Sequence, residues 1–309
     1  MTSVSNLNMD KRLSPSTVVF LILPPLLWAG NAIVGRLFSD QIPPITLNFI
    51  RWLLALLILI PLGRAAFVRG SGLLSNWRRY AVLGLLGVGL YNGLQYMALH
   101  TSTPVNVTLV GASMPIWMLV IGALFFHTPI TRTQIVGAIL SIAGVLLVLA
   151  HGDWRQLADF HFVIGDIFML IATLIWAFYS WLLVDTSDSP QIRGHWTTFL
   201  LAQVLYGTVW SGAFAGIEWA VTDWAIQWSW PLAAALVYVT IGPALIAFRC
   251  WGAGVQRVGP STAGLFYNLT PMFAAVMSVL LLGETPRAYH GVAFMLIVGG
   301  IAVSARRSR

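Results

Sequence analysis

Long apolar stretches fill most of this 309-residue chain, and only short polar breaks separate them. A helix needs about 20 apolar residues to cross the hydrocarbon core of a bilayer, where backbone polar groups must be hydrogen-bonded within the protein. The pattern therefore predicts an all-α integral membrane protein. We expect ten transmembrane helices, over residues 16–38, 44–63, 79–99, 104–126, 131–150, 163–184, 195–215, 231–255, 260–282 and 287–305.

The composition agrees with this pattern. Hydrophobic residues make up 58% of the chain and charged residues 9%, whereas a soluble domain has roughly 25% charged residues. Ten helices would use most of the chain, which leaves too little for a large soluble domain. The single cysteine, Cys250, lies in an apolar stretch, so the chain cannot form an internal disulfide.

The positions of the basic residues predict how the helices are oriented, because cytoplasmic loops accumulate Lys and Arg. A cytoplasmic N-terminus places twelve basic residues inside and only Arg36, Arg155 and Arg287 outside. We therefore expect a multi-pass protein of the cell inner (plasma) membrane with both termini in the cytoplasm. This topology accounts for the net charge of +7, so no nucleic-acid partner is needed to explain it. The twelve are Lys11, Arg12, Arg64, Arg69, Arg78, Arg79, Arg132, Arg193, Arg257, Arg306, Arg307 and Arg309.

The two halves of the chain repeat one another. Pro104 and Pro260 are 156 residues apart, and so are Pro115 and Pro271, with similar residues between them and no gap. The repeat predicts two units, residues 1–150 and 151–309, with five spans each. Because five is odd, the second unit must enter the membrane inverted. Inverted repeats are typical of alternating-access transporters, which bind substrate near the midplane between the repeats.

Four kinds of sequence motif follow one another along the chain: Trp28-Ala29-Gly30-Asn31, Arg51-Trp52-Leu53-Leu54-Ala55, the paired proline segments, and Leu282-Gly283-Glu284-Thr285. In these motifs the chain resembles the drug/metabolite transporter superfamily, in its ten-helix EamA branch. The resemblance covers nearly the whole chain. It implies a secondary transporter that exports small metabolites through a cavity lined mainly by helices one, three, four, six, eight and nine. Within the family the chain is most similar to bacterial exporters of amino acids, including aromatic ones.

Aromatic and amide side chains lie at helical spacing on the expected cavity helices. Tyr91, Asn92 and Gln95 share one face of the third span, because residues three and four apart are neighbours on a helix. Such a lining suits a neutral or zwitterionic solute with an apolar side chain. The alternative is that the tryptophans are interfacial anchors or core residues and the amides only join helices. The candidate substrate-binding residues are Trp28, Asn31, Tyr91, Asn92, Gln95, Met114, Trp117, Trp176, Tyr179, Phe248, Trp251, Tyr267 and Asn268.

Prolines and arginines within the spans are further candidates. Pro115, Pro243 and Pro271 break helical hydrogen bonds, so they predict gates or hinges, with static kinks as the alternative. Arg51 and Arg249 could each bind a substrate carboxylate through the guanidinium fork. The alternative for both is snorkelling to the nearer interface.

Other functional classes find less support in the sequence. The enzyme motifs H-E-x-x-H and G-x-S-x-G are missing, and no ring of charges indicates a channel. We therefore expect a transporter that needs no cofactor and no metal, with an amino acid as substrate and membrane lipid as surroundings. Its oligomeric state stays open, and a monomer is compatible with the sequence. The runner-up substrates are nucleotide sugars or phosphorylated sugars, for which only two intramembrane arginines are available. The first span carries no Asp or Glu, so export without proton coupling is the simpler hypothesis.

Overall fold

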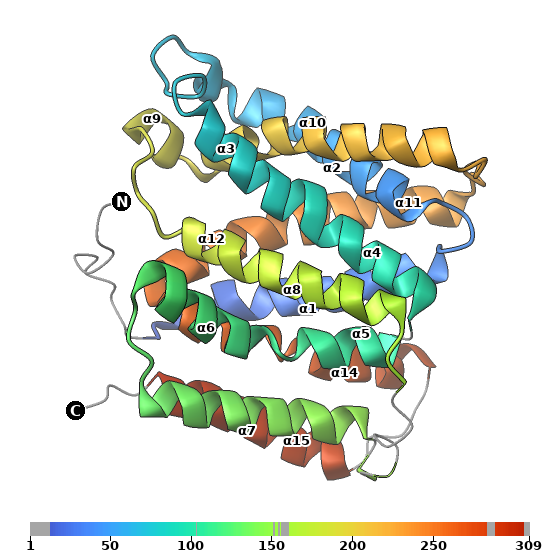
Figure 1. The fold of residues 1–309 in the computed structure, drawn as a ribbon, viewed down its shortest axis with the longest axis vertical. Coiled ribbons are helices and arrows are strands. Elements are labelled where there is room, and N and C mark those ends of the chain that lie inside the picture. The colour runs from blue at the N-terminus through green and yellow to red at the C-terminus, as the bar shows by residue number, and fades with distance from the viewer. Residues whose placement is uncertain are drawn as a thin grey trace.

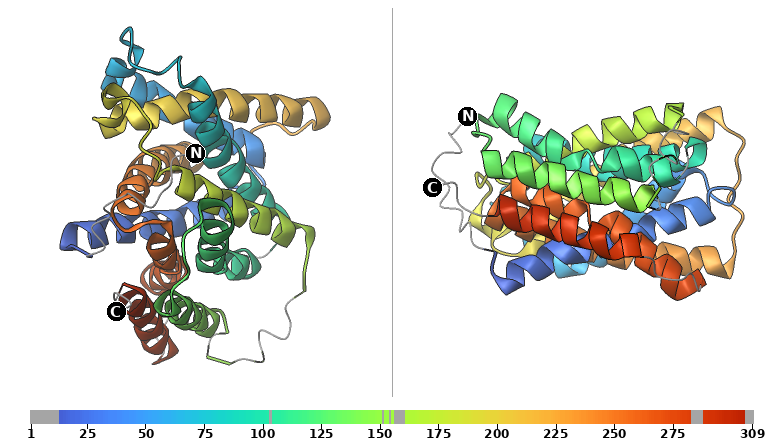
Figure 2. Two further views of the ribbon diagram at one scale, coloured as in Figure 1. Left: turned by 60° about the vertical axis from the view of Figure 1, so that its left-hand side comes forward. Right: turned by 90° about the horizontal axis from the view of Figure 1, so that it is seen from below.

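The computed structural model contains helices as its only regular elements in the part of the chain that it describes. Those residues are 13–102, 104–150, 152–153, 155, 161–282 and 288–305. Residues 1–12, 283–287 and 306–309 are not described. The predictions made for Lys11, Arg12, Glu284, Arg287, Arg306, Arg307 and Arg309 therefore lie outside the described residues. The helices run side by side along one direction and form a single bundle (Figures 1 and 2).

The first half of the chain folds into α1 (Pro15–Leu37), α2 (Pro44–Leu62), η2 (Arg64–Phe67), α3 (Trp77–Gly84), η3 (Leu85–Leu90), α4 (Tyr91–Thr101), α5 (Pro104–Gly111), α6 (Met114–Phe126) and α7 (Arg132–Leu149). The second half folds into α8 (Ile164–Leu182), α9 (Pro190–Arg193), α10 (Trp196–Val221), α11 (Trp230–Val239), η5 (Thr240–Ile246), α12 (Ala247–Val258), α13 (Pro260–Tyr267), α14 (Thr270–Leu282) and α15 (Ala288–Ser304).

Eight helical stretches in the described residues are long and apolar enough to cross a membrane. The prediction of an all-helical membrane protein is therefore confirmed. The expected number of ten spans is not confirmed, because in the described part of the chain the last two expected spans do not appear as helices of that length and composition. Residues 260–282 form α13 and α14 with a turn between them, and α15, with 17 residues, is slightly shorter than the other spans. The eight are Pro15–Leu37, Pro44–Leu62, Trp77–Thr101, Asn106–Phe126, Arg132–Leu149, Ile164–Leu182, Trp196–Val221 and Trp230–Val258.

Local sequence explains where several helices begin. Ser14 caps α1 by accepting a hydrogen bond from the backbone N–H of Thr17, and a proline follows it. Thr131 and Gln134 form a capping box at the start of α7. Before α13 the chain passes through Gly259 at φ 82°, a conformation that glycine adopts without steric cost. The turns that precede α6 and α14 each end close to a proline, which cannot donate a helical hydrogen bond.

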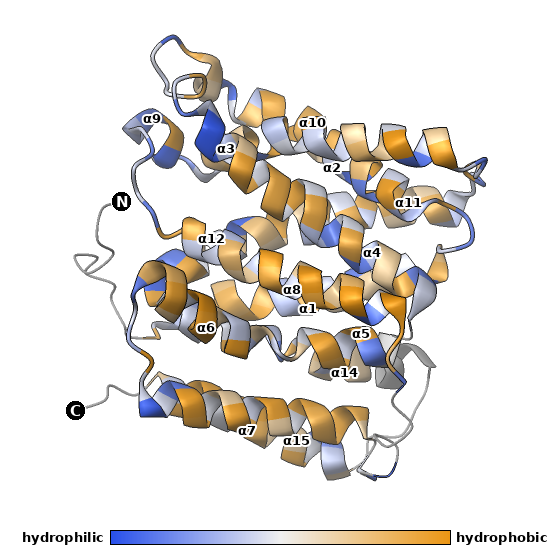
Figure 3. Cartoon of the chain, viewed as in Figure 1, coloured by the Kyte–Doolittle hydropathy of each residue, from blue (hydrophilic) through white to orange (hydrophobic). Residues whose placement is uncertain are grey.

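The outer surface of the bundle is apolar along the helices. Leu57, Ile139 and Met295 are examples of large hydrophobic side chains that are more than half exposed. Polar residues gather at the connections and at the two ends of the bundle (Figure 3). A soluble protein rarely exposes such an extended apolar surface, whereas a lipid-facing surface requires it.

Several elements recur at the separation found in the sequence. The bounds of α5 and α13 are each 156 residues apart, and the same holds for α6 and α14. A π-helical segment, η3 or η5, interrupts the same place in each half, between α3 and α4 and between α11 and α12. The repeat noted in the sequence thus extends to where helices begin, end and change their hydrogen bonding.

Helices from the two halves pack directly against each other. The most extensive cross-half contacts join α1 with α12, α2 with α10, α4 with α8, and α7 with α15. At the start of α2, Glu218 of α10 accepts hydrogen bonds from the backbone N–H groups of Ile45 and Thr46, at 3.0 and 2.7 Å. A carboxylate at a helix N-terminus satisfies free donors and complements the helix dipole.

The α7–α15 pair depends on a close approach of two backbones. A Cβ added to Gly300 would lie 2.5 Å from the carbonyl oxygen of Gly137. At the neighbouring Gly299, no atom of another described element lies within 4 Å of such a Cβ. Small residues at contacts of this kind let membrane helices pack tightly.

We expect Gly300→Ala to destabilise the protein by about 1–3 kcal/mol, because the new methyl group collides with backbone that cannot move independently. Gly299→Ala makes the same change in composition and helix propensity on the open side of α15, so it serves as the matched control. Thermal unfolding of both variants in detergent measures the difference. Equal transition temperatures would show that the α7–α15 contact is looser than described.

Candidate functional site

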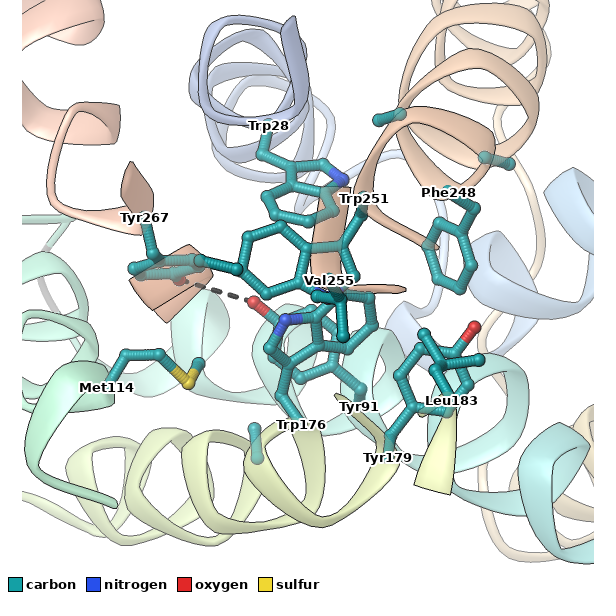
Figure 4. Packing of buried hydrophobic residues seen from close by; sticks show 14 of the residues in the cluster. Trp28, Tyr91, Met114, Trp176, Tyr179, Leu183, Phe248, Trp251, Val255 and Tyr267 are labelled. Atoms are coloured by element: carbon teal, nitrogen blue, oxygen red, sulfur yellow. Dashed lines mark hydrogen bonds between the residues drawn. The ribbon is translucent and has the colours of Figure 1, made fainter. Parts of the chain in front are cut away.

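A cluster of buried aromatic side chains occupies the middle of the bundle (Figure 4). Trp176 of α8 is fully buried and lies at its centre. Its ring is 4.4 Å from that of Tyr91 and 4.9 Å from that of Tyr179, measured between centroids. It also contacts the rings of Trp28, Phe248 and Trp251, at 5.2, 5.2 and 5.8 Å. The predicted aromatic residues from α1, α4, α8 and α12 therefore meet at one place.

Polar atoms of this cluster join the two halves of the chain. The hydroxyl groups of Tyr91 and Tyr267 are 3.2 Å apart and share a hydrogen bond. The indole N–H of Trp28 donates to the carbonyl oxygen of Pro243, within the π-helical segment η5, at 3.4 Å. The rings of Trp28, Tyr91 and Tyr267 are thus each held by tilted or edge-to-face ring contacts and by one hydrogen bond.

Next to the aromatic cluster lies a polar cluster built around Arg51 of α2. The side chain of Arg51 is fully buried. Its Nη1 lies 3.1 Å from Asn31 Oδ1, 3.1 Å from Asn92 Oδ1 and 2.8 Å from the hydroxyl of Tyr96. The hydroxyl of Tyr96 donates to Asn31 Oδ1, and Asn31 Nδ2 donates to Gln95. Three predicted amides and one predicted arginine therefore form a single network across α1, α2 and α4.

Tyr96 and Trp52 belong to this network, although the sequence reasoning did not select them. Tyr96 lies four residues after Asn92 and therefore on the same face of α4, so helical spacing could have identified it. Trp52 lies with its ring centroid 5.2 Å from the guanidinium carbon of Arg51. Its ring also contacts Phe248 at 4.8 Å, which connects the polar cluster to the aromatic one.

Other predicted residues lie apart from these clusters. Asn268 is buried but donates to Ser141 of α7, and Trp117 donates to Ser113 one turn earlier in the chain. Arg249 is partly exposed and lies over the rings of Phe20 and Trp196, at 5.8 and 4.7 Å.

The three predicted hinge prolines and Met114 are placed at helix interruptions. Pro115 follows the turn before α6, and Met114, which is fully buried, begins that helix. Pro271 stands at the second residue of α14, and Pro243 lies inside η5. All three prolines therefore adjoin places where the regular helical hydrogen-bond pattern changes.

Comparison with known proteins identifies the family. A model of the EamA-like transporter family matches residues 15–150 and 163–306. The chain belongs to the EamA-like transporter family. The family resemblance in the sequence motifs is thereby confirmed, and the chain is a multi-pass membrane protein of a family of transporters.

Individual members of the EamA-like family are similar over almost the full length. An uncharacterized transporter of Archaeoglobus fulgidus is 25% identical, over 96% of this chain and 99% of its own. The aromatic amino acid exporter YddG of Ancylobacter novellus is 25% identical, over 92% and 95%. A probable amino-acid metabolite efflux pump of Salmonella typhimurium is 22% identical, over 92% of each. One crystal structure shares the fold, with a TM-score of 0.69, 22% identity, and coverage of 93% and 96%.

A network of charges ties the two halves of this EamA-like chain together at one end of the bundle. Asp188, whose side chain has no exposed surface, contacts Arg79 Nε at 2.9 Å and Arg193 Nη1 at 2.8 Å. Asp185, whose side chain is 46% exposed, contacts Arg79 Nη1. Burial lowers the pKa of Arg193, and the neighbouring Asp188 opposes that shift. The network links the start of α3 to the connection between α8 and α10.

A second buried carboxylate lies at the opposite end of α8. Asp166 accepts hydrogen bonds from the Ser102 hydroxyl at 2.5 Å and from the backbone N–H of Val163 at 2.9 Å. Asn106 of α5 donates to Oδ2 of Asp166, the oxygen that also accepts from Val163, at 3.3 Å. Asp166 therefore joins the ends of α4, α5 and α8, away from the aromatic cluster.

We expect Asp188→Asn to lower the free energy of unfolding by about 2–3 kcal/mol, because two largely buried guanidinium groups lose their shared counter-charge. We expect a smaller loss than for a fully buried ion pair, because the side chains of Arg79 and Arg193 are still 15% and 18% exposed. The matched control Asp185→Asn should cost less than about 1 kcal/mol, as is usual for an exposed ion pair. Chemical unfolding in detergent micelles measures both, and equal losses would contradict the assignment.

Proposed function

We propose that the protein is a secondary transporter that exports amino acids, aromatic or other neutral ones, across the bacterial inner membrane. Export proceeds by alternating access through a central cavity. The observation that carries the proposal is the meeting of aromatic rings from both halves of the chain around Trp176, next to the amides of the first half around Arg51. Ligand sites are mostly apolar and aromatic with a few directional polar groups, as this region is.

The names of two relatives support an amino acid as the substrate. One is an aromatic amino acid exporter and the other a probable amino-acid metabolite efflux pump. The rings of Trp28, Trp176 and Tyr91 offer stacking surfaces for an apolar or aromatic side chain. Asn31, Asn92 and Gln95 can hold the polar groups of the same molecule.

We further propose ten transmembrane helices in two inverted units, 1–150 and 151–309. In this scheme α13 with α14 is the ninth span and α15 the tenth. The recurrence of helix bounds at 156 residues supports a repeat, and the family match also falls into two segments, 15–150 and 163–306. An odd number of spans in each unit requires the inversion, which alternating access uses to exchange inward-facing and outward-facing states.

The interruptions of the helices are the proposed hinges. In η3, Asn48 donates to the carbonyl oxygens of Val88 and Gly89, at 2.9 and 3.3 Å. In η5, Trp28 donates to the carbonyl oxygen of Pro243. These side chains satisfy carbonyl groups in segments whose helical hydrogen bonding is altered, so the segments can bend without exposing polar backbone to lipid.

We expect the purified protein, reconstituted in liposomes, to take up labelled phenylalanine or threonine saturably and to exclude a labelled nucleotide sugar. An imposed proton gradient should leave uptake unchanged, because we propose downhill export. Trp176→Ala should lower uptake about tenfold or more, since it removes several ring contacts of roughly 0.5–1.5 kcal/mol each. Trp230→Ala, at a tryptophan that is 89% exposed, is the matched control. Transport confined to the nucleotide sugar would replace the proposal by the anionic runner-up.

The orientation yields a separate prediction. Exposed Thr186 precedes α9 and exposed Ala225 follows α10, so they lie at opposite ends of that 26-residue helix. In a Cys250→Ala background, Ala225→Cys should react with a membrane-impermeant maleimide in intact cells. Thr186→Cys should react only after the cells are permeabilised. The reverse pattern would place both termini outside the cytoplasm.

A further inference from the structure

Arg51 carries a buried positive charge that has no acidic partner among the described residues. It is the only buried Lys or Arg in that part of the chain, and each salt bridge found there involves Arg79 or Arg193. The three oxygens around its Nη1 belong to two amides and a phenol, all of them neutral. A buried charge without a counter-charge is costly, and intramembrane charges commonly mark functional sites.

The hydrogen bonds of Arg51 occupy only one side of its guanidinium group. Among the described residues, Nη1 makes all hydrogen bonds of this side chain, while Nε and Nη2 have no hydrogen-bond partner. Nε and Nη2 form the edge that binds the two oxygens of a carboxylate in parallel. The network through Asn31, Asn92 and Tyr96 therefore fixes the plane of the group and leaves its carboxylate-binding edge unused.

The neighbouring unpartnered atoms are also donors. Five buried side-chain nitrogen atoms in the described residues lack a partner: two of Arg51, and one each of Trp52, Asn92 and Trp176. These residues form one contact network. Trp52 lies against Arg51, Asn92 bonds to Arg51, and Trp176 stacks on Tyr91 beside Asn92. Because unsatisfied buried donors are costly, their concentration here indicates a ligand that supplies acceptor oxygens.

We propose that the Nε and Nη2 edge of Arg51 binds the carboxylate of the transported molecule, and that the transported class is therefore carboxylate-bearing solutes with an apolar or aromatic side chain. This inference rests on the proposed function and names its substrate class. The carboxylate supplies the missing counter-charge. The rings of Tyr91 and Trp176 then lie beside the rest of the molecule. Arg249, which lies over Phe20 and Trp196, takes no part.

One cation favours a singly charged group over a phosphate ester. A sugar diphosphate brings two or more negative charges, and in the described residues the cluster offers Arg51 as its one buried cation. A single carboxylate balances that charge and matches the geometry of the guanidinium edge.

Competition against labelled phenylalanine uptake in proteoliposomes tests the inference on the wild-type protein. Phenylpropionate keeps the carboxylate and lacks the amine, whereas phenethylamine keeps the amine and lacks the carboxylate. We expect phenylpropionate to compete and phenethylamine to compete at least about tenfold more weakly. Equal competition by the two compounds would overturn the proposal without affecting the evidence for amino-acid transport.

Variants of the network then identify the residue. Arg51→Gln should weaken the binding of phenylalanine and phenylpropionate by about 10- to 100-fold and leave phenethylamine unchanged. Arg51→Lys should recover part of the loss, because it restores the charge without the planar edge. Exposed Arg132 provides the control Arg132→Gln, which should behave as wild type. Loss of carboxylate selectivity in Arg249→Gln with selectivity retained in Arg51→Gln would overturn the assignment.

Asn31→Asp gives an independent test that does not depend on losing a charge. The new carboxylate would lie where Asn31 Oδ1 already contacts Arg51 Nη1. It should raise the thermal transition temperature of the ligand-free protein and abolish stabilisation by phenylpropionate, because the charge is then balanced internally. An unchanged response to phenylpropionate would overturn the proposal.

Direct binding separates this inference from the proposed function. If no amino acid is transported, the proposed function fails, and thermal shifts with phenylpropionate still decide the role of Arg51. Stabilisation of the wild type but not of Arg51→Gln would retain the carboxylate site. Absence of stabilisation in the wild type would remove it. Comparison of Arg51→Gln with the wild type by size-exclusion chromatography establishes that the variant is folded.

Discussion

The guanidinium group of Arg51 is a full positive charge in the interior of a bundle whose outer surface is apolar. A charge at this depth must be surrounded by acceptor oxygens. Asn31, Asn92 and Tyr96 provide them, and they come from two other helices, α1 and α4. One side chain thereby sets how three helices of the first half lie relative to one another. The aromatic cluster packs against this arrangement through Trp52 and Phe248.

Polar interactions divide between the middle and the ends of the protein. In the middle, amides, phenols and one guanidinium group contact each other among aromatic rings. Toward the ends, carboxylates such as Asp188, Asp166 and Glu218 join helix termini to neighbouring elements. Asp188 and Asp166 are buried, so breaking their contacts is costly, and they hold the adjoining helix ends in place.

At the helix interruptions η3 and η5, side chains donate hydrogen bonds to backbone carbonyl groups. η3 and η5 depart from regular α-helical hydrogen bonding, and side chains of Asn48 and Trp28 bond to carbonyl groups within them. Without such partners, free carbonyl groups in the apolar interior would each cost free energy. Trp28 also contacts Trp176 and Trp251. The aromatic cluster therefore contacts the backbone of η5 directly through Trp28.

The sequence by itself determined the helical membrane class, eight of the apolar helices and the family, because helical hydrogen bonds and apolar length are local properties. It also selected Trp176, Tyr91, Asn31 and Arg51, whose residue types are unusual inside a membrane. Only the tertiary structure decided that these residues meet. The partners of Arg51 are 20, 41 and 45 residues away along the chain. The tertiary structure also distinguished buried Arg51 from partly exposed Arg249, although both are arginines within predicted spans. It further revealed the role of Tyr96 and the ion pairs of Asp188. Such contacts depend on how helices rotate and pack, and one helix's sequence does not specify the neighbour that it faces.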